Sequence, residues 1–170
     1  MSEHVKVAYD SKSAGLEKWL DETYKKLPVQ LPDGARKWIA DNAWWLTLIG
    51  GVLSLWGAWG FWQTAHYVSQ LNDWARAAGV STAPNLSVMW YVVLVTMLVE
   101  AVLYLMAVSK LKAHQKGGWN LIFYASLVSV VMGLVYLFVP SYGFGSLVGV
   151  ALGAIIGWFF LFQVRSKFVK

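Results

Sequence analysis

Four stretches of this 170-residue chain are apolar over a length sufficient to cross a lipid bilayer. They cover residues 44–66, 88–108, 119–139 and 142–164. Because a helix rises 1.5 Å per residue, about twenty residues span a hydrocarbon core roughly 30 Å thick. Only 14% of all residues are charged, against roughly 25% in a soluble domain. The sequence therefore predicts an all-α fold, a four-span transmembrane helical bundle.

The basic residues are segregated in a way that orients this bundle. Thirteen of the fourteen Lys and Arg residues lie in residues 1–43, between the second and third runs, or after the fourth run. Only Arg76 lies on the other side of a four-span arrangement. The positive-inside rule then predicts a multi-pass protein of the inner (cytoplasmic) membrane with both termini cytoplasmic. The net charge of +5 is explained by this orienting charge and by anionic headgroups, so we expect the lipid bilayer and no nucleic acid as a partner.

Residues 1–43 form the one substantial polar segment, ahead of a membrane domain over residues 44–170. The segment predicts an amphipathic cytoplasmic helix that ends at Pro28 and Pro32. We expect this helix either to lie on the cytoplasmic leaflet or to dock a partner protein. Its apolar positions are Leu16, Trp19, Leu20, Tyr24 and Leu27, and the residues expected to face away are Lys18, Asp21, Glu22 and Lys25.

Local signals also mark the ends of the first span. Asp33 follows Pro32 and is expected to cap a second short helix that leads into the span. The helical pattern continues beyond His66, and Gly79 is the expected stop signal. Pro84 and Asn85 are the expected start of the second span.

Aromatic residues near the ends of the apolar runs predict a belt at the membrane–water interfaces. His66 shares a helical face with Trp56 and Trp59, but the other two histidines, His4 and His114, belong to the opposite side of the membrane. A haem site with two histidine ligands is therefore not expected. The chain has no cysteine, so thiolate metal sites are excluded, and we expect neither a metal nor a cofactor. The predicted interfacial residues are Trp19, Trp44, Trp45, Trp90 and Trp119.

Glu100 lies near the middle of the second apolar run. A carboxylate at that depth is costly unless it is paired, hydrated or protonated, and is a candidate functional group by default. Thr96, Glu100 and Tyr104 are spaced by four and share one helical face. Three interpretations stay open: a hydrogen-bonded Glu that ties helices together, a site that binds a proton or cation, or a group that binds a substrate or a partner's basic residue. Small and hydroxyl residues that could converge on it are Ser126, Ser129, Gly133 and Tyr136 in the third run and Thr47, Gly51, Ser54 and Ala58 in the first.

The fourth run carries a glycine ridge, defined by Gly145, Gly149, Gly153 and Gly157. These residues recur every four positions and form three overlapping GxxxG units. Glycine lets another helix approach closely, which promotes helix association in lipid. The ridge predicts either tight packing inside one bundle or the formation of a homo-oligomer.

Motifs of soluble enzymes are absent from the sequence, including GxxxxGK[ST], GxSxG and HExxH. Beyond residue 41 the acidic residues are Asp73 and Glu100. One is expected in a loop and the other in mid-membrane, so they cannot act as an acid/base pair. We therefore expect a protein that is not an enzyme.

The apolar segments resemble those of a group of uncharacterised small four-span proteins found in bacteria with reduced genomes. The similar segments are residues 42–57 (NAWWLTLIGGVLSLWG), 99–112 (VEAVLYLMAVSKLK), 118–136 and 145–167, which ends in LFQVRSK. The resemblance implies four spans and includes Glu100, and the group has no established activity.

Two functions are expected from these features. The first is a structural or interaction protein that packs or oligomerises through the glycine ridge and recruits a cytoplasmic partner through its N-terminal helix. The second is a small transporter or channel in which Glu100 binds a proton or cation, assisted by Thr96, Tyr104 and Ser129.

Overall fold

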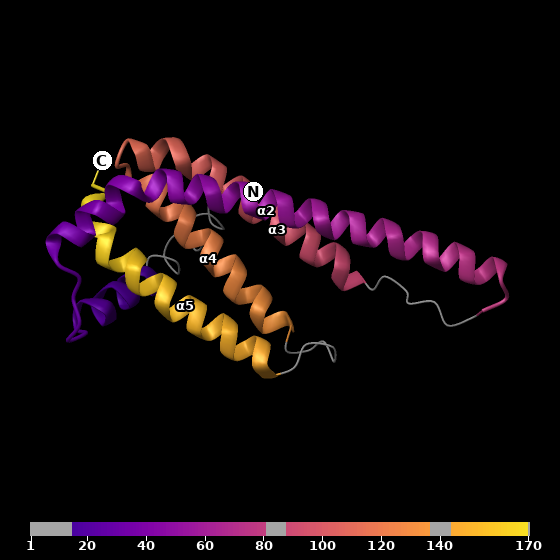
Figure 1. Cartoon of the computed structure of the whole chain (residues 1–170). Coiled ribbons are helices and arrows are strands. Elements are labelled where there is room, and N and C mark those ends of the chain that lie inside the picture. The colour runs from indigo at the N-terminus through magenta and orange to yellow at the C-terminus, as the bar shows by residue number, and fades with distance from the viewer. Residues whose placement is uncertain (1–14, 81–87, 137–143, 170) are drawn as a thin grey trace, which may run out of the picture.

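The computed structural model describes residues 15–80, 88–136 and 144–169, and the regular structure in these ranges is entirely helical (Figure 1). A short N-terminal helix over residues 15–25 precedes four long helices. Each of the four is long and apolar enough to cross a membrane. The predicted all-α fold class with four spans is confirmed. The long helices are α2 (Asp33–Ala77), α3 (Val88–Lys112), α4 (Lys116–Tyr136) and α5 (Phe144–Val164), and a 3-10 turn, η1 (Arg165–Lys167), follows α5.

The first long helix, α2, is much longer than the predicted span. Its 45 residues make it about 67 Å long, roughly twice the thickness of a hydrocarbon core. The expected separate short helix capped by Asp33 is wrong, because neither proline nor glycine interrupts residues 35–43. Pro32 occupies the N-cap position without a side-chain cap, and Asp33 lies in the first turn, where its charge complements the helix dipole.

The other end of α2 stops where the sequence indicates. Gly79 adopts a φ of +71°, a left-handed conformation that glycine accommodates without steric cost. Its N–H donates to the carbonyl of Arg76 at 3.1 Å, and the N–H of Val80 donates to the carbonyl of Ala75 at 2.8 Å. This double hydrogen bond is the Schellman arrangement. The expected start of the second span at Pro84 and Asn85 lies outside the described residues.

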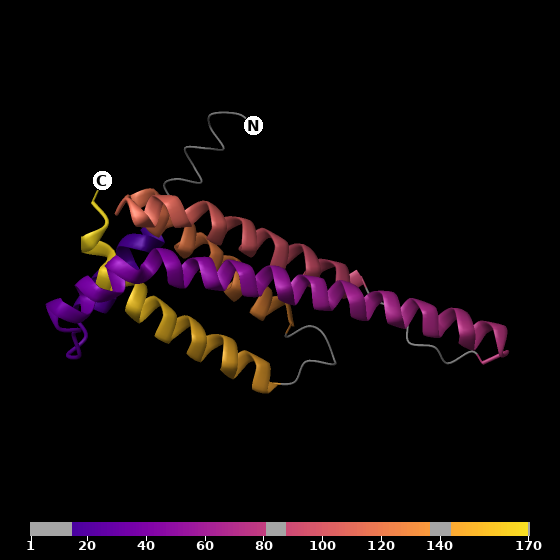
Figure 2. The same cartoon turned by 45° about the horizontal axis from the view of Figure 1, so that its top comes forward.

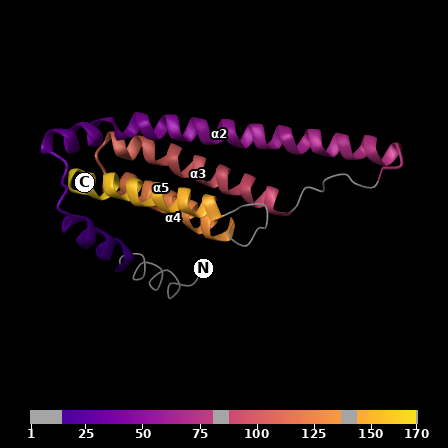
Figure 3. The same cartoon turned by 60° about the horizontal axis from the view of Figure 1, so that its bottom comes forward.

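The long helices form an open arrangement. Helix α3 packs along α2 and α4 packs along α3, whereas α5 packs mainly on α4 and touches α2 sparsely. The N-terminal helix, the α3–α4 connection and η1 lie at one end, called the terminal end here (Figure 1). Towards the opposite end α5 diverges from α2, and α2 extends well beyond the other helices (Figures 2 and 3).

The best-packed part of the protein lies at the terminal end. Leu111, Trp119 and Phe123 are its largest fully buried side chains. Leu20 and Tyr24 of the N-terminal helix join the same cluster, so this helix packs against the bundle.

The buried face of the N-terminal helix differs from the expected one. Asp21, expected to face away, is only 8% exposed, whereas Trp19 is 61% exposed. The Asp21 carboxylate lies 3.0 Å from Nη1 of Arg165, and Glu17 also forms an ion pair with this guanidinium. Because Arg165 lies at the other end of the chain, the local apolar pattern carries no sign of this contact. Ionic attraction to Arg165 thus turns the acidic residues inwards.

Tyr24 completes the attachment of this helix to α5. Its ring stacks on Phe162 with centroids 5.6 Å apart, and its hydroxyl donates a hydrogen bond of 3.1 Å to the carbonyl of Ile155. Burial raises the pKa of Tyr24, because desolvation disfavours the phenolate.

Replacing Asp21 by Asn tests the ion pair with Arg165. We expect Asp21→Asn to lower the free energy of unfolding by about 1–3 kcal/mol, because a charge-assisted hydrogen bond is weakened and a mostly buried guanidinium loses a partner. The adjacent Glu22 is exposed, so Glu22→Gln is the matched control and should have almost no effect. Unfolding in detergent measures both, and equal losses would contradict the contact.

Raising the pH should weaken the attachment through Tyr24. Its folded-state pKa lies above the ordinary value of about 10, so its stabilising contribution is present below that pH and is lost as the pH rises through the folded pKa. We therefore expect the wild type to be more stable than Tyr24→Phe by about 1 kcal/mol near neutral pH, and this difference to disappear at strongly alkaline pH. Thermal unfolding of both proteins across pH measures it. If the difference in stability between the wild type and Tyr24→Phe stayed the same at every pH, the buried, hydrogen-bonded state of the Tyr24 hydroxyl would be contradicted.

Candidate functional site

Glu100 of α3 is bound to α4 through a hydroxyl group. Ser129 Oγ donates a hydrogen bond of 2.6 Å to Glu100 Oε1. The same hydroxyl lies 3.3 Å from the carbonyl of Ala125, but its single proton can serve only one strong bond at a time. Among the described residues, Glu100 forms no ion pair. The pair thus links two helices by one short hydrogen bond.

The other two residues expected beside Glu100 have separate contacts. Thr96 Oγ1 donates to the carbonyl of Val92 at 2.8 Å, one turn back in its own helix. Tyr104 packs against α2, where its Cβ would lie 3.3 Å from a methyl group placed on Gly51. Within the described chain, Ser129 is therefore the residue that bonds the carboxylate directly.

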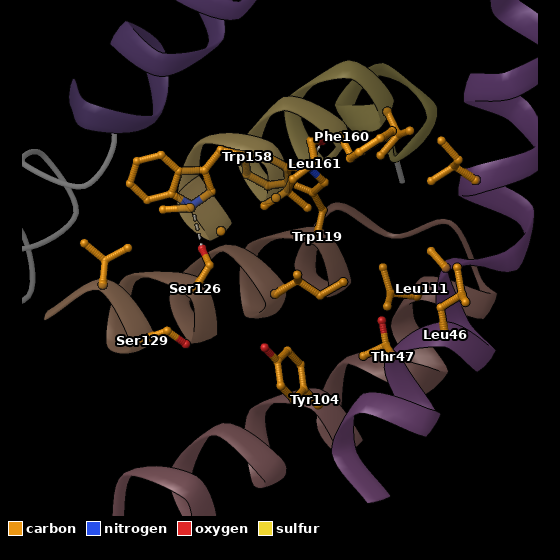
Figure 4. Close-up of a pocket in the computed structure, with 18 of the residues that line it drawn as sticks. Leu46, Thr47, Tyr104, Leu111, Trp119, Ser126, Ser129, Trp158, Phe160 and Leu161 are labelled. Atoms are coloured by element: carbon orange, nitrogen blue, oxygen red, sulfur yellow. Dashed lines mark hydrogen bonds between the residues drawn. The ribbon is translucent and has the colours of Figure 1, made fainter. Parts of the chain in front are cut away.

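A groove of about 500 Å³ lies beside this pair, where α5 separates from α2. Side chains from all four long helices line it, and most of them are apolar. Figure 4 shows residues of α2 and α3 facing those of α5 across it. Tyr104 and Ser129 both reach the groove, so the Glu100 pair adjoins it without Glu100 itself forming the wall. The hydroxyl groups among its lining residues belong to Thr47, Tyr104, Ser126 and Ser129.

Two indole groups hold α4 against α5 at one side of the groove. Trp158 Nε1 donates to Ser126 Oγ at 2.8 Å (Figure 4). Trp119 Nε1 donates to the carbonyl of Leu161 at 2.8 Å. Such bonds have no water to compete with them in an apolar setting. They fix α5 to α4, and α5 is left apart from α2.

The glycine ridge of α5 follows the edge of this groove. A methyl group placed on Gly149, Gly153 or Gly157 would meet no described atom within 4 Å, so these glycines make no close helix contact within the described chain. Gly153 and Gly157 line the groove. The surroundings of Gly145, in the first turn of α5, lie outside the described residues.

Other glycines provide the close approaches between helices. A Cβ on Gly133 of α4 would collide with the Val150 side chain of α5, and one on Gly57 of α2 would lie 2.6 Å from Met97 Cε of α3. At Gly118 it would lie 2.7 Å from the backbone nitrogen of Leu111. The sequence places Gly133 on a small-residue stripe, but we did not expect it to be a packing residue. Its spacing of four from Ser129 is the signal that could have indicated this role.

The predicted interfacial tryptophans have different surroundings. Trp19 is strongly exposed, and Trp44, Trp45 and Trp90 are half-buried. Trp119 is buried, with only 1% of it exposed. Its stacking on Phe123, at 5.4 Å between centroids, makes it part of the core at the terminal end.

No protein-family model, curated protein or solved structure matches the chain. Of the expected resemblance, the four long apolar helices are present, and no family is identified.

Adding a methyl group to different glycines tests which of them pack within one chain. We expect Gly133→Ala to destabilise the monomer by about 1–3 kcal/mol, because Val150 is β-branched and cannot swing aside freely. Gly149→Ala enters open space and should not destabilise the monomer; the higher helix propensity of alanine should raise its stability by up to about 1 kcal/mol. Unfolding in detergent at a concentration where the protein is monomeric measures both. A loss of stability in Gly149→Ala would contradict this arrangement.

Proposed function

We propose that this chain is a structural or interaction protein of the membrane, not an enzyme, and that it associates with a second copy through the glycine ridge of α5. The observation that carries the proposal is the open space at Gly149, Gly153 and Gly157. In lipid, helices associate by close packing, and small residues permit it. A ridge of small residues that the described part of the chain leaves unfilled is suited to a helix from outside.

The surroundings of the ridge support this proposal. Large apolar side chains on the same helix are exposed, among them Leu152 at 53% and Ile156 at 55%. They provide an apolar wall along one side of the glycines, so a second helix would gain van der Waals contact there as well as on the ridge. The close contacts inside the monomer are supplied by other glycines.

The proposal also covers the orientation of the chain in the membrane and a binding surface on the N-terminal helix. The distribution of basic residues supports a cytoplasmic terminal end. On the N-terminal helix, Leu20 and Tyr24 are used internally, whereas Trp19 is 61% and Leu16 is 39% exposed. This second pair is the face that we propose for a cytoplasmic partner.

Replacing a ridge glycine by a bulky residue tests the association. We expect Gly153→Leu to convert an oligomer to monomer while the helical content and the thermal stability of the monomer persist, because the leucine fills the space that a second helix needs. Gly60 of α2 also has open space around it, so Gly60→Leu is the matched control and should leave the oligomer intact. Light scattering in detergent and cross-linking in membranes measure the oligomeric state. A monomeric wild type, or an oligomer unaffected by Gly153→Leu, would refute the proposal.

The Glu100–Ser129 pair favours a second candidate function, the binding of a proton or cation during transport. A carboxylate in mid-span with one hydroxyl partner is able to exchange a proton if water reaches it. Tyr104 and Ser129, whose hydroxyl groups lie near Glu100 in this proposal, both line the groove. Among the described residues, no group of three His, Cys, Asp or Glu side chains is placed to hold a metal ion, which favours a proton or a weakly bound cation.

Replacing Glu100 by Gln separates the two candidate functions. Glu100→Gln keeps an oxygen that accepts from Ser129 but removes titration. If transport is the function, proton or monovalent-cation flux into proteoliposomes should fall to the level of empty vesicles. Ser129→Ala is the companion variant, because it removes the hydrogen bond and keeps the carboxylate. Equal flux for wild type and Glu100→Gln would exclude transport through this residue.

A further inference from the structure

A second cavity, of about 360 Å³, lies at the terminal end. Residues of the N-terminal helix, the start of α2, the start of α4, the end of α5 and η1 line it. Among its described lining residues four are basic, Lys25, Arg36, Lys116 and Arg165, and one is acidic, Asp21. We call it the basic pocket.

The acidic residues nearby neutralise only part of this charge. Lys25 Nζ lies 2.6 Å from Asp21, and Arg165 pairs with both Asp21 and Glu17. Lys116 Nζ lies 3.9 Å from Glu17 and is 54% exposed, so its ion pair is weak. Counting Glu17 and Asp33, which pair with lining residues, four cations face three carboxylates among the described residues, so one positive charge remains in excess.

Each of the two arginines in the basic pocket has at least one N–H group that donates no hydrogen bond within the described chain. Arg36 Nη2 donates to Gln30 Oε1 at 3.2 Å, and the nearest carboxylate to Arg36, Asp33, is 3.7 Å away and 88% exposed. Within the described chain, Nε of Arg36 and Nε of Arg165 are shielded from solvent and have no hydrogen-bond partner. A shielded N–H group without a partner is unfavourable, so neither guanidinium is fully paired within the described chain.

From this cluster we infer that the basic pocket binds a phosphate group. A phosphate carries several acceptor oxygens in a compact anion, and guanidinium groups match it geometrically while lysines add point charge. Arg36 and Lys116 supply the charge that is least neutralised. Glu17 and Asp21 orient Arg165.

The position of the pocket allows two sources of this phosphate. Phe168 lines both the basic pocket and the apolar groove, so the site lies where an apolar surface meets a charged one. A phospholipid headgroup has its phosphate at such a boundary, and a soluble phosphate compound could enter from the aqueous side.

The test uses the full-length protein purified in a non-ionic detergent and delipidated. Inorganic phosphate is titrated by calorimetry, with chloride at equal ionic strength as the reference. In a second arm, native mass spectrometry measures retention of phosphatidylglycerol against phosphatidylcholine from mixed micelles. The variants are Arg36→Gln and Lys116→Gln. Lys37→Gln is the matched control, because Lys37 is the neighbour of Arg36 in the chain, does not line the pocket and is 76% exposed.

We expect each pocket variant to weaken binding about tenfold or more, as the loss of a charge-assisted hydrogen bond does, and Lys37→Gln to change it less than about twofold. Retention of phosphatidylglycerol without any binding of inorganic phosphate would assign the site to a lipid headgroup. Binding of inorganic phosphate would assign it to a soluble compound. Absence of both, or equal loss in Lys37→Gln, would overturn the inference. Far-UV circular dichroism of each variant shows whether the fold persists, and Arg36→Lys, which keeps the charge but not the planar guanidinium, should retain only part of the affinity.

Discussion

Helices that lie side by side in lipid gain no hydrophobic stabilisation from their contact, because the acyl chains are as apolar as the side chains. Their contacts depend on close packing and on a few hydrogen bonds. In this protein those contacts are unevenly distributed. Gly133 lets α4 approach Val150 of α5, and Ser129 bonds Glu100 across α3 and α4. Helices α2 and α5 have few contacts of either kind, and the groove lies between them.

The terminal end supplies the stability that this open arrangement lacks. There the helices meet through stacked rings, including Tyr24 on Phe162 and Trp119 on Phe123. Arg165 adds ion pairs with two acids of the N-terminal helix, which hold the polar segment against the membrane domain. With one end secured in this way, α5 can diverge from α2 and leave its glycine face open. The same ion pairs also shape the basic pocket, so packing and ligand binding share residues at this end.

Much of the fold follows from local properties of the sequence, and the relations between helices do not. Hydropathy predicted four spans, and Gly79 marked the end of α2, because length and backbone conformation are local. The inward turn of Asp21 depends on Arg165, which is distant in sequence. The spacing of Gly149, Gly153 and Gly157 showed that they share a face, but it could not show which helix, if any, that face meets. The bond from Ser129 to Glu100 was foreseen as a convergence of stripes, and the separate bond of Thr96 to its own backbone was not.

Cysteine cross-linking along α5 in native membranes tests the central claim that its glycine face is open within one chain and meets a second copy. The chain has no cysteine, so single replacements report one position each. We expect disulfide-linked dimers for Gly149→Cys and Gly153→Cys, and none for Ala151→Cys and Ile155→Cys, which lie on another face of the helix. Cross-linking that is absent at both glycine positions, or equal at all four positions, would contradict that claim.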